Sequence, residues 1–271
     1  MSKVLIATEK PFAAPAVAGI KQILSEAGFD VVLLEKYTAK SELLAAVADV
    51  DAIIIRSDII DKEVFDAARQ LKIVVRAGAG YDNVDLEAAT AHGVCVMNTP
   101  GQNANAVAEL VFALLLFSVR NRFNGTSGTE LKDKKLGLLA YGNTGRNVAR
   151  IAKGIGMDIY AYDPFTPAEV IEKEGVHAVA SQKELFSTCD VVSLHIPATP
   201  ETKGSIGREL VSLLPKKAIL VNTARKEIIN EPELIALLKE REDLRYLADI
   251  RPAAHEEFEA AAGERYFSTP K

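Results

Sequence analysis

A glycine-rich loop followed by a single aspartate is the pattern in this sequence that points most directly to chemistry. The loop reads Ala140-Tyr-Gly-Asn-Thr-Gly145 and separates the apolar run Leu136–Leu139 from a segment with helical spacing. A helix N-terminus offers unpaired N–H groups and a positive dipole to a pyrophosphate. Further on, Asp163 closes the next apolar run, where an acid would bind the adenine ribose of a dinucleotide. Because no Arg or Lys follows Asp163 at once to bind a 2′-phosphate, the pattern favours NAD over NADP.

The loop departs from the usual glycine pattern at its first position. Ala140 stands where the first glycine would be, and an alanine at a strand end makes that turn at modest strain. We therefore expect the loop to keep its function.

A second glycine loop, Arg76-Ala-Gly-Ala-Gly80, competes for the same role. The next apolar run after it ends at Asn98 and offers no carboxylate, so it is the weaker dinucleotide candidate. Arg76 and Arg56 each end an apolar run, and the carboxyl ends of parallel strands line the ligand crevice. Two guanidinium groups there indicate a small anionic substrate with a carboxylate or phosphate. The alternative is a pair of surface arginines, each paired with a nearby acid.

Short apolar runs alternate with amphipathic stretches along the chain, which predicts an α/β fold with parallel strands and helices on both faces. The expected strands are Val4–Ala7, Val31–Leu34, Ala52–Ile55, Ile73–Val75, Val94–Met97, Leu136–Ala140, Ile159–Tyr162, Val191–His195, Ala218–Val221 and Tyr246–Asp249. The expected helices are Ala14–Ala27, Lys40–Ala48, Lys62–Leu71, Leu86–His92, Asn103–Arg120, Gly145–Ile155, Pro167–Glu174, Gln182–Ser187, Arg208–Leu214 and Glu231–Lys239.

The length of the chain and a segment with Pro and Gly between two series of strands predict two doubly wound domains. A chain of 271 residues is too long for one ordinary core. The segment Asn98-Thr-Pro-Gly101 closes the first series of strands, so we place the domains at residues 1–98 and 99–271. The helix Asn103–Arg120 has a wide apolar face, which fits either burial against another domain or subunit or a place in the centre of a core.

The composition excludes several classes of protein. The chain is 48% hydrophobic and 25% charged, with a net charge of −5, so we expect neither a nucleic acid nor a membrane as partner. The longest apolar stretch, Ala106–Val119, contains Glu109 and falls short of the roughly 20 residues that span a bilayer. The first residues hold too short an apolar run for a secretory signal. Cys95 and Cys189 form no disulfide framework or zinc-site spacing, which favours a cytoplasmic location and no metal.

Taken together, these motifs resemble those of the D-2-hydroxyacid dehydrogenase family. The matching segments follow the family's order over nearly the whole chain: Arg76-Ala-Gly-Ala-Gly-Tyr-Asp-Asn-Val-Asp, Asn98-Thr-Pro-Gly101, Ala108-Glu109, Ala140–Gly145, His195-Ile-Pro197-Ala-Thr199 and Val221-Asn-Thr-Ala-Arg225. The resemblance implies NAD as cofactor, a flavodoxin-like substrate domain followed by a Rossmann NAD-binding domain, and a reaction in the cleft. It also implies a homodimer through the nucleotide domain. Arg56-Ser57 and Arg76 resemble the branch that oxidises 3-phosphoglycerate.

The resemblance also implies a role for each matching residue. Arg225 would bind the substrate carboxylate and polarise the carbonyl oxygen with its planar, two-pronged cation. The other substrate-binding residues would be Arg56, Ser57 and Arg76 on the phosphate and Gly78 beside the carboxylate. The cofactor-binding residues would be Gly142, Asn143, Thr144 and Gly145 at the pyrophosphate loop, Asp163 at the ribose, His195, Pro197 and Thr223 on the nicotinamide side, and Asp249 at the nicotinamide amide.

The chain departs from the family pattern at the catalytic base. The family's usual base is a histidine after Thr-Pro, oriented by a glutamate, but here Lys271 follows Thr269-Pro270 and Ala254 stands at the glutamate position. A lysine has no tautomer to fix, and a nearby carboxylate would raise its pKa, so the loss of the glutamate fits lysine as base. Our hypothesis is that neutral Lys271 takes the hydroxyl proton. The alternatives are a solvated lysine without a role and a conventional base from His255 and Glu256.

Two other functions fit the same residues. The first is a reductase of another small 2-oxo acid, such as glyoxylate or hydroxypyruvate. The second is a non-catalytic NAD-sensing module, which needs Asp163 and the loop but neither Arg225 nor a base. Family members continue with a helix that returns to the substrate domain. We expect this return, and the cover it gives the first domain, to be missing from a chain that stops at Lys271.

Overall fold

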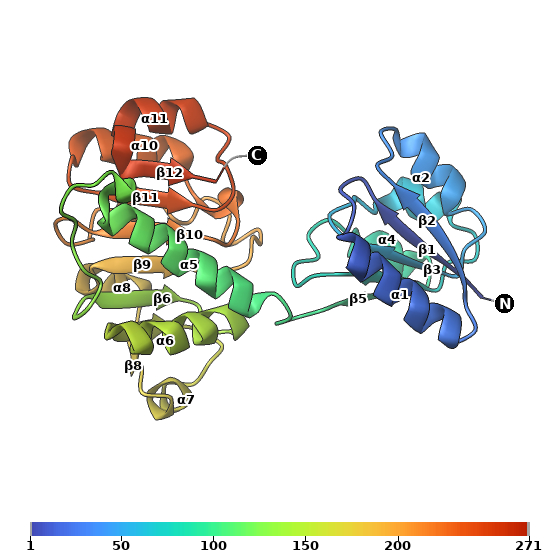
Figure 1. Ribbon diagram of the computed structural model, residues 1–271, viewed down its shortest axis with the longest axis horizontal. Coiled ribbons are helices and arrows are strands. Elements are labelled where there is room, and N and C mark those ends of the chain that lie inside the picture. Colours follow the sequence, from blue (N-terminus) through green and yellow to red (C-terminus); the bar gives the residue numbers. More distant parts are fainter. Residues whose placement is uncertain (1, 270–271) are drawn as a thin grey trace. The chain divides into compact units, whose positions relative to one another are not determined.

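The computed structural model describes residues 2–269, which fold into two compact units divided between Asn103 and Ala104 (Figure 1). The division falls in the short segment that follows the last strand of the first unit, just beyond the boundary placed after residue 98. In both units every pair of neighbouring strands that the structure describes is parallel.

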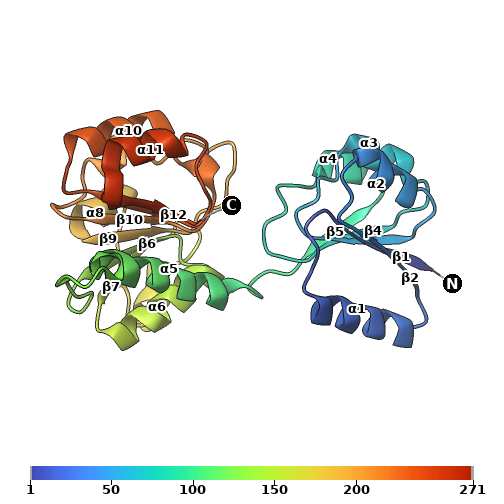
Figure 2. The same cartoon turned by 45° about the horizontal axis from the view of Figure 1, so that its top comes forward.

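The first unit is built on a five-stranded sheet in the order β2-β1-β3-β4-β5. The strands are β1 (Lys3–Thr8), β2 (Asp30–Glu35), β3 (Ala52–Ile55), β4 (Ile73–Arg76) and β5 (Cys95–Asn98). Helix α1 (Ala14–Glu26) covers one face, and α2 (Lys40–Ala46), α3 (Lys62–Ala67) and α4 (Leu86–Ala91) cover the other (Figure 2). This is the flavodoxin-like order expected from the sequence, with its topological switch point between β1 and β3.

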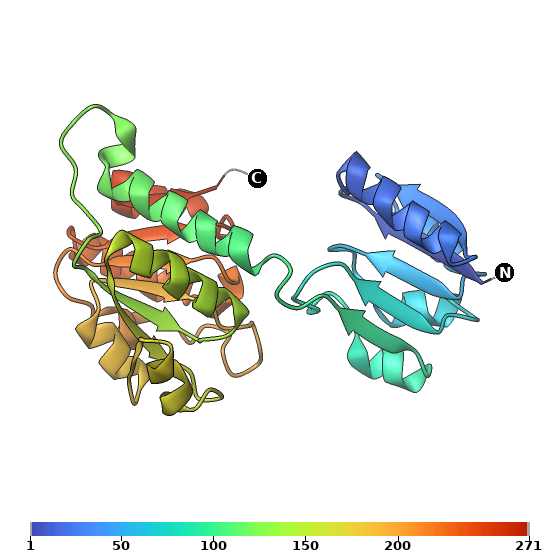
Figure 3. The same ribbon diagram turned by 60° about the horizontal axis from the view of Figure 1, so that its bottom comes forward.

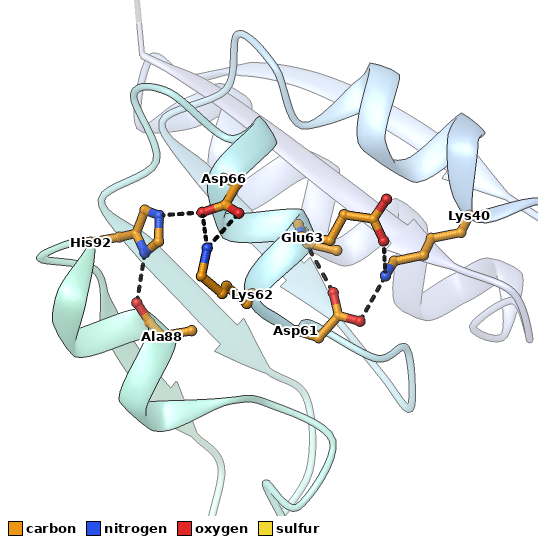
Figure 4. A network of polar contacts seen from close by, with 8 residues as sticks. Lys40, Asp61, Lys62, Glu63, Asp66, Ala88 and His92 are labelled. Carbon is orange, nitrogen blue, oxygen red and sulfur yellow. Dashed lines mark hydrogen bonds and ion pairs between the residues drawn. The ribbon is translucent and has the colours of Figure 1, made fainter.

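The three helices on one face of the first sheet are joined at the surface by a network of polar contacts (Figure 4). Asp61 caps α3 by accepting the Val64 N–H, and its carboxylate also accepts Lys40 Nζ of α2 at 2.7 Å. On the next turn, Asp66 accepts His92 Nε2 of α4 at 3.0 Å. Beneath these exposed contacts the apolar strand residues form the core, and Leu5, Ile53, Ile55 and Val74 are fully buried there.

The second unit is built on a seven-stranded sheet in the order β12-β11-β10-β9-β6-β7-β8. The strands are β6 (Lys135–Leu139), β7 (Asp158–Tyr162), β8 (His177–Ala178), β9 (Val191–Leu194), β10 (Ile219–Asn222), β11 (Arg245–Ala248) and β12 (Tyr266–Ser268). The helices are α5 (Ala104–Val119), η1 (Asn121–Phe123), α6 (Asn143–Ile155), α7 (Ala168–Lys173), α8 (Gln182–Thr188), α9 (Arg208–Val211), η2 (Lys226–Ile228), α10 (Glu231–Glu240), α11 (His255–Ala262) and η3 (Gly263–Arg265). Because the order reverses between β6 and β9, the sheet is of the Rossmann type.

Each face of the second sheet has its own core. Phe186 of α8, Leu238 of α10 and Phe258 of α11 pack on one face, and α5 and α6 lie side by side over the other (Figure 3). Helix α5 places Phe112 and Leu115 in the core of its own unit, so most of its wide apolar face is used there. Leu116 remains 42% exposed.

The sequence patterns missed six elements of the second unit: α11, β8, β12 and the three short 3₁₀ helices η1, η2 and η3. The two strands have only two and three residues, too few to show a period, and the first turn of α11 is polar, with Glu256 and Glu257 after His255. Among the residues that the structure describes, no helix is both long and apolar enough to cross a membrane.

Candidate functional site

The residues assigned to the cofactor lie together at the carboxyl edge of the second sheet. Backbone hydrogen bonds continue one residue beyond the strands: His195 N–H donates to Leu139 O at 2.9 Å, and Asp249 N–H donates to Asn222 O at 3.0 Å. The residues that follow β6, β9, β10 and β11 are therefore held side by side, on both sides of the switch point where dinucleotides bind in such sheets.

The glycine loop makes a turn that few residues can form. Ala140 has a φ of +80°, in the left-handed region where glycine is preferred, so the missing first glycine does cost strain. Gly145 packs so closely under this turn that an added Cβ would lie 2.5 Å from Ala140 O. Nothing lies within 4 Å of a Cβ placed at Gly142, so the backbone there is open to a ligand.

Asp163 is tied to the same loop. One carboxylate oxygen accepts the Tyr141 N–H and the other accepts the Phe165 N–H, both at 2.8 Å. The Thr166 hydroxyl adds a hydrogen bond of 3.2 Å. The carboxylate is thus fixed beside the loop with about one lone pair left for a ribose hydroxyl, since a carboxylate accepts about four hydrogen bonds and three are already made.

The N-terminus of α6 suits a bound pyrophosphate. Gly142 is its N-cap and has no side chain to accept the first amide groups, so Asn143 and Thr144 present their N–H groups at the positive end of a helix of 13 residues. Behind the loop, Tyr141 is 1% exposed, and its hydroxyl donates to Glu174 at 2.9 Å, while Arg146 stacks on its ring and pairs with the same glutamate. These residues fit the NAD expected from the sequence.

Three unpartnered polar atoms of the described residues are buried on the other side of the switch point, and one of them, Ser193 Oγ, lies within β9. His195 Nε2 and Thr223 Oγ1 have no hydrogen-bond partner among the described residues. Burial lowers the pKa of His195 to about 4, so its imidazole is neutral near neutral pH. A neutral ring with a buried, unpartnered nitrogen is suited to hydrogen-bond a ligand rather than to carry charge. Pro197 lies two residues further on, on the exposed loop that follows.

Arg225 is positioned by Asn222, a residue to which the sequence motifs assigned no role. Asn222 is 4% exposed, and its side chain accepts the Ala224 N–H at 3.0 Å and donates to Arg225 O at 2.9 Å. These two hydrogen bonds hold the turn directly after β10. Arg225 follows in an extended conformation, immediately before η2. A buried amide at the end of an apolar strand was the signal available in the sequence.

The end of the described chain lies beside Asp249. The Thr269 hydroxyl donates to Asp249 O, and the Thr269 N–H donates to Ala248 O at 3.2 Å. Lys271 lies outside the described residues. Both ring nitrogens of His255, the first residue of α11, have partners. Nδ1 lies 2.9 Å from the Tyr266 hydroxyl, and Nε2 lies 3.2 Å from the Glu259 carboxylate.

The residues assigned to the substrate lie at the carboxyl edge of the first sheet. Arg76 ends β4 and is paired in register with Ile55, the residue before Arg56, so the two arginines leave neighbouring strands. Arg56 and Ser57 are exposed. The Arg76 guanidinium lies where a side chain at Gly78 would project, so the glycine leaves room for it.

Comparison with known proteins identifies the second unit. Residues 116–262 match the model of the D-isomer-specific 2-hydroxyacid dehydrogenase NAD-binding domain. The chain is 40% identical over 234 residues to D-3-phosphoglycerate dehydrogenase of Methanocaldococcus jannaschii, covering 81% of this chain and 43% of that protein. It is 36% identical over 219 residues to hydroxypyruvate reductase of Thermotoga maritima, covering 76% and 70%. The chain thus spans less than half of the first of these relatives.

A solved structure resembles nearly the whole chain. The crystal structure of NAD+-bound 3-phosphoglycerate dehydrogenase from Entamoeba histolytica has a TM-score of 0.93 and 48% identity, and the match covers 99% of this chain and 86% of that one. The chain belongs to the D-isomer-specific 2-hydroxyacid dehydrogenase family, and its second unit is the NAD-binding domain of that family.

The packing of Gly145 predicts a specific loss of NADH binding. In Gly145→Ala the new Cβ meets Ala140 O and distorts the loop, so we expect the dissociation constant for NADH to rise by about tenfold or more. Gly154→Ala, in the same helix with nothing within 4 Å of the added Cβ, is the matched control and should bind as the parent chain does. Titration of NADH fluorescence measures both. Equal affinities for the two variants would contradict the role given to Gly145 in the loop.

Proposed function

We propose that the protein is an NAD-dependent dehydrogenase that oxidises D-3-phosphoglycerate to 3-phosphohydroxypyruvate, the first step of serine biosynthesis. The observation that carries the proposal is the pair Arg56 and Arg76 on adjacent strand ends of the first sheet. Two guanidinium groups at one sheet edge suit a substrate with a phosphate in addition to its carboxylate. Relatives named for phosphoglycerate, in Methanocaldococcus jannaschii and Entamoeba histolytica, support the same substrate.

The residues of the second unit fit the chemistry of a 2-hydroxy acid. Bound NAD supplies an acceptor for the hydride that leaves C2 of the substrate. Arg225 binds the carboxylate and stabilises the growing negative charge on the carbonyl oxygen. Because His195 is neutral, it adds no positive charge beside the nicotinamide, and its Nε2 is available to a polar group there.

The hydroxyl proton needs a base, and we assign this role to Lys271. The proton would pass from the C2 hydroxyl to the lysine nitrogen and the C2–H electron pair would leave with the hydride for the cofactor. The O–H and C2–H bonds thus break as the C2–O bond becomes double. A lysine accepts a proton only when it is neutral, and the usual lysine pKa of about 10.4 must be lowered for this. A guanidinium or the nicotinamide cation beside the lysine would act in that direction.

A second candidate is the reduction of an unphosphorylated 2-oxo acid. The hydroxypyruvate reductase of Thermotoga maritima supports it, because that relative matches over 70% of its own length. The two candidates share the NAD site, Arg225 and the base. They differ in whether Arg56 and Arg76 bind a phosphate.

We further propose that the protein works in the cytoplasm as a homodimer through its nucleotide domain. Exposed apolar side chains support a subunit contact on the α5 side. Leu116 is 42% exposed and Phe123 is 67% exposed, and the Phe123 ring lies 5.7 Å from that of Phe117. Two free cysteines, one of them exposed, fit a reducing compartment.

The substrate proposal is tested by comparing a phosphorylated and an unphosphorylated 2-oxo acid. The full chain should oxidise NADH with 3-phosphohydroxypyruvate at a kcat/KM at least about tenfold above that with hydroxypyruvate or glyoxylate. Arg56→Ala and Arg76→Ala should raise the KM for the phosphorylated acid by about tenfold or more and change the KM for hydroxypyruvate little. Arg69→Ala, an exposed arginine away from the strand ends, is the control.

The outcomes of this assay separate the candidates. A preference for hydroxypyruvate, with equal effects of the arginine variants on both acids, would favour the second candidate. NADH binding without turnover of any 2-oxo acid would show a sensing module instead of an enzyme.

The role of Lys271 is tested by its removal. Without a base, kcat in the oxidation direction should fall by about a hundredfold or more in Lys271→Ala, because proton transfer typically contributes 10²–10⁴-fold. The NADH dissociation constant should stay unchanged. Lys239→Ala, an exposed lysine near the end of α10, serves as control. If Lys271→Ala keeps turnover within a few-fold of the parent chain, another group is the base.

A further inference from the structure

Asp58 is a buried carboxylate at the switch point of the first sheet, and it lies two residues after Arg56. Asp58 is 3% exposed, whereas Arg56 and Ser57 lie at the surface. A carboxylate this deeply buried persists only where donors surround it. None of the sequence motifs assigned a role to Asp58.

The carboxylate joins the ends of three strands. Oδ1 accepts the Glu9 N–H at 2.8 Å, just beyond β1, and the Tyr37 hydroxyl at 2.7 Å, just beyond β2. Oδ2 accepts the N–H of Arg56, the first residue after β3, at 3.2 Å. The backbone of Arg56 is thus held by the same group that holds the loop across the switch point.

The backbone carbonyl of Asp58 is held by a residue of another loop, Asn83. Asn83 Nδ2 donates to Asp58 O at 2.7 Å, and the Ile60 N–H donates to Asn83 O at 2.9 Å. Asn83 lies in the loop that follows Arg76 and Gly78. The segment that carries Arg56 is therefore fastened to the segment that carries Arg76, and Asp58 is the residue where these contacts meet.

The cost of losing the carboxylate falls first on Tyr37, whose hydroxyl is buried with it. Tyr37 is 6% exposed, and burial together with its hydrogen bond to Asp58 raises its pKa far above the ordinary value. Without Asp58, the buried Tyr37 hydroxyl would lack its acceptor, and the Glu9 and Arg56 N–H groups would lose theirs. The loop would have to move to satisfy them.

We propose that Asp58 is a positioning residue that sets the conformation of the Arg56 segment and so determines how tightly the substrate phosphate binds. The inference rests on the proposed function, because it takes the phosphate as the group that Arg56 binds. It adds a residue that contacts no substrate and acts only through the backbone of Arg56. A small displacement of a binding group is enough to weaken binding strongly.

Asp58→Asn tests the proposal with the least disturbance. The amide oxygen can keep the Glu9 and Tyr37 contacts of Oδ1, but the NH2 group that replaces Oδ2 cannot accept the Arg56 N–H. We expect the KM for 3-phosphohydroxypyruvate to rise by about tenfold, with the KM for hydroxypyruvate, the kcat and the NADH dissociation constant within about threefold of the parent chain. Asp58→Ala should have a larger effect on the same ratio of KM values.

Asp61→Ala is the matched control for a merely structural effect. Asp61 caps α3 in the same segment, and its carboxylate accepts the Val64 N–H and Lys40 Nζ, whereas the Arg56 N–H donates to Asp58. Asp61→Ala should lower the thermal midpoint without changing the ratio of the two KM values. Tyr37→Phe, which removes one donor and leaves Oδ2 in place, should change the ratio less than Asp58→Asn.

The KM ratios of these variants separate the positioning role from the proposed function. If Arg56→Ala changes the KM ratio but Asp58→Asn and Asp58→Ala do not, the positioning role is wrong and the proposed function stands. The positioning role is also wrong if Asp61→Ala changes the ratio as much as Asp58→Asn. If Arg56→Ala itself leaves the ratio unchanged, Arg56 does not bind the phosphate, and the proposed substrate and the positioning role are both overturned.

Discussion

The loops at the carboxyl edge of each sheet depend on polar side chains that replace the hydrogen bonds that the strands no longer supply. A loop that leaves a buried parallel strand carries backbone N–H and C=O groups that need partners. Asp58 supplies them for the loops after β1 and β3, Asp163 for the loop after β6, and Asn222 for the loop after β10. Each of these residues lies next to a group with a proposed role in binding or catalysis.

The same constraint leaves the ligand-binding donors available. Tyr141 N–H is taken by Asp163, while the first amide groups of α6, a few residues on, point from an uncapped helix N-terminus. Gly145 permits this arrangement by packing against Ala140, which itself holds a left-handed turn. Within this short segment, one backbone N–H is held by Asp163 and the next N–H groups are left without a partner in the loop. A bound anion would accept hydrogen bonds from the latter.

The sequence predicted the parts of this arrangement that depend on local pattern. Apolar runs of three to five residues located the long strands, and the parallel topology then required that Arg56, Arg76 and Asp163 lie at strand ends. The partners of those side chains could not be predicted, because Asp58 bonds to Glu9 and Tyr37 across long stretches of chain. The short strand β12 and helix α11 could not be predicted for a different reason. Their stability comes from packing beside β11 and α10, not from their own periodicity.

Residue-resolved amide hydrogen exchange on the full chain tests most directly whether polar side chains hold these loops. If they do, the N–H groups of Glu9, Tyr141 and Ala224 exchange slowly, at rates near those of the core strands, although they lie in loops. The N–H groups of Asn143 and Thr144 should exchange fast in the free chain and slow down when NADH is added. Fast exchange at Glu9, Tyr141 and Ala224, equal to that of exposed loops, would show that these side chains do not hold the edge of the sheets.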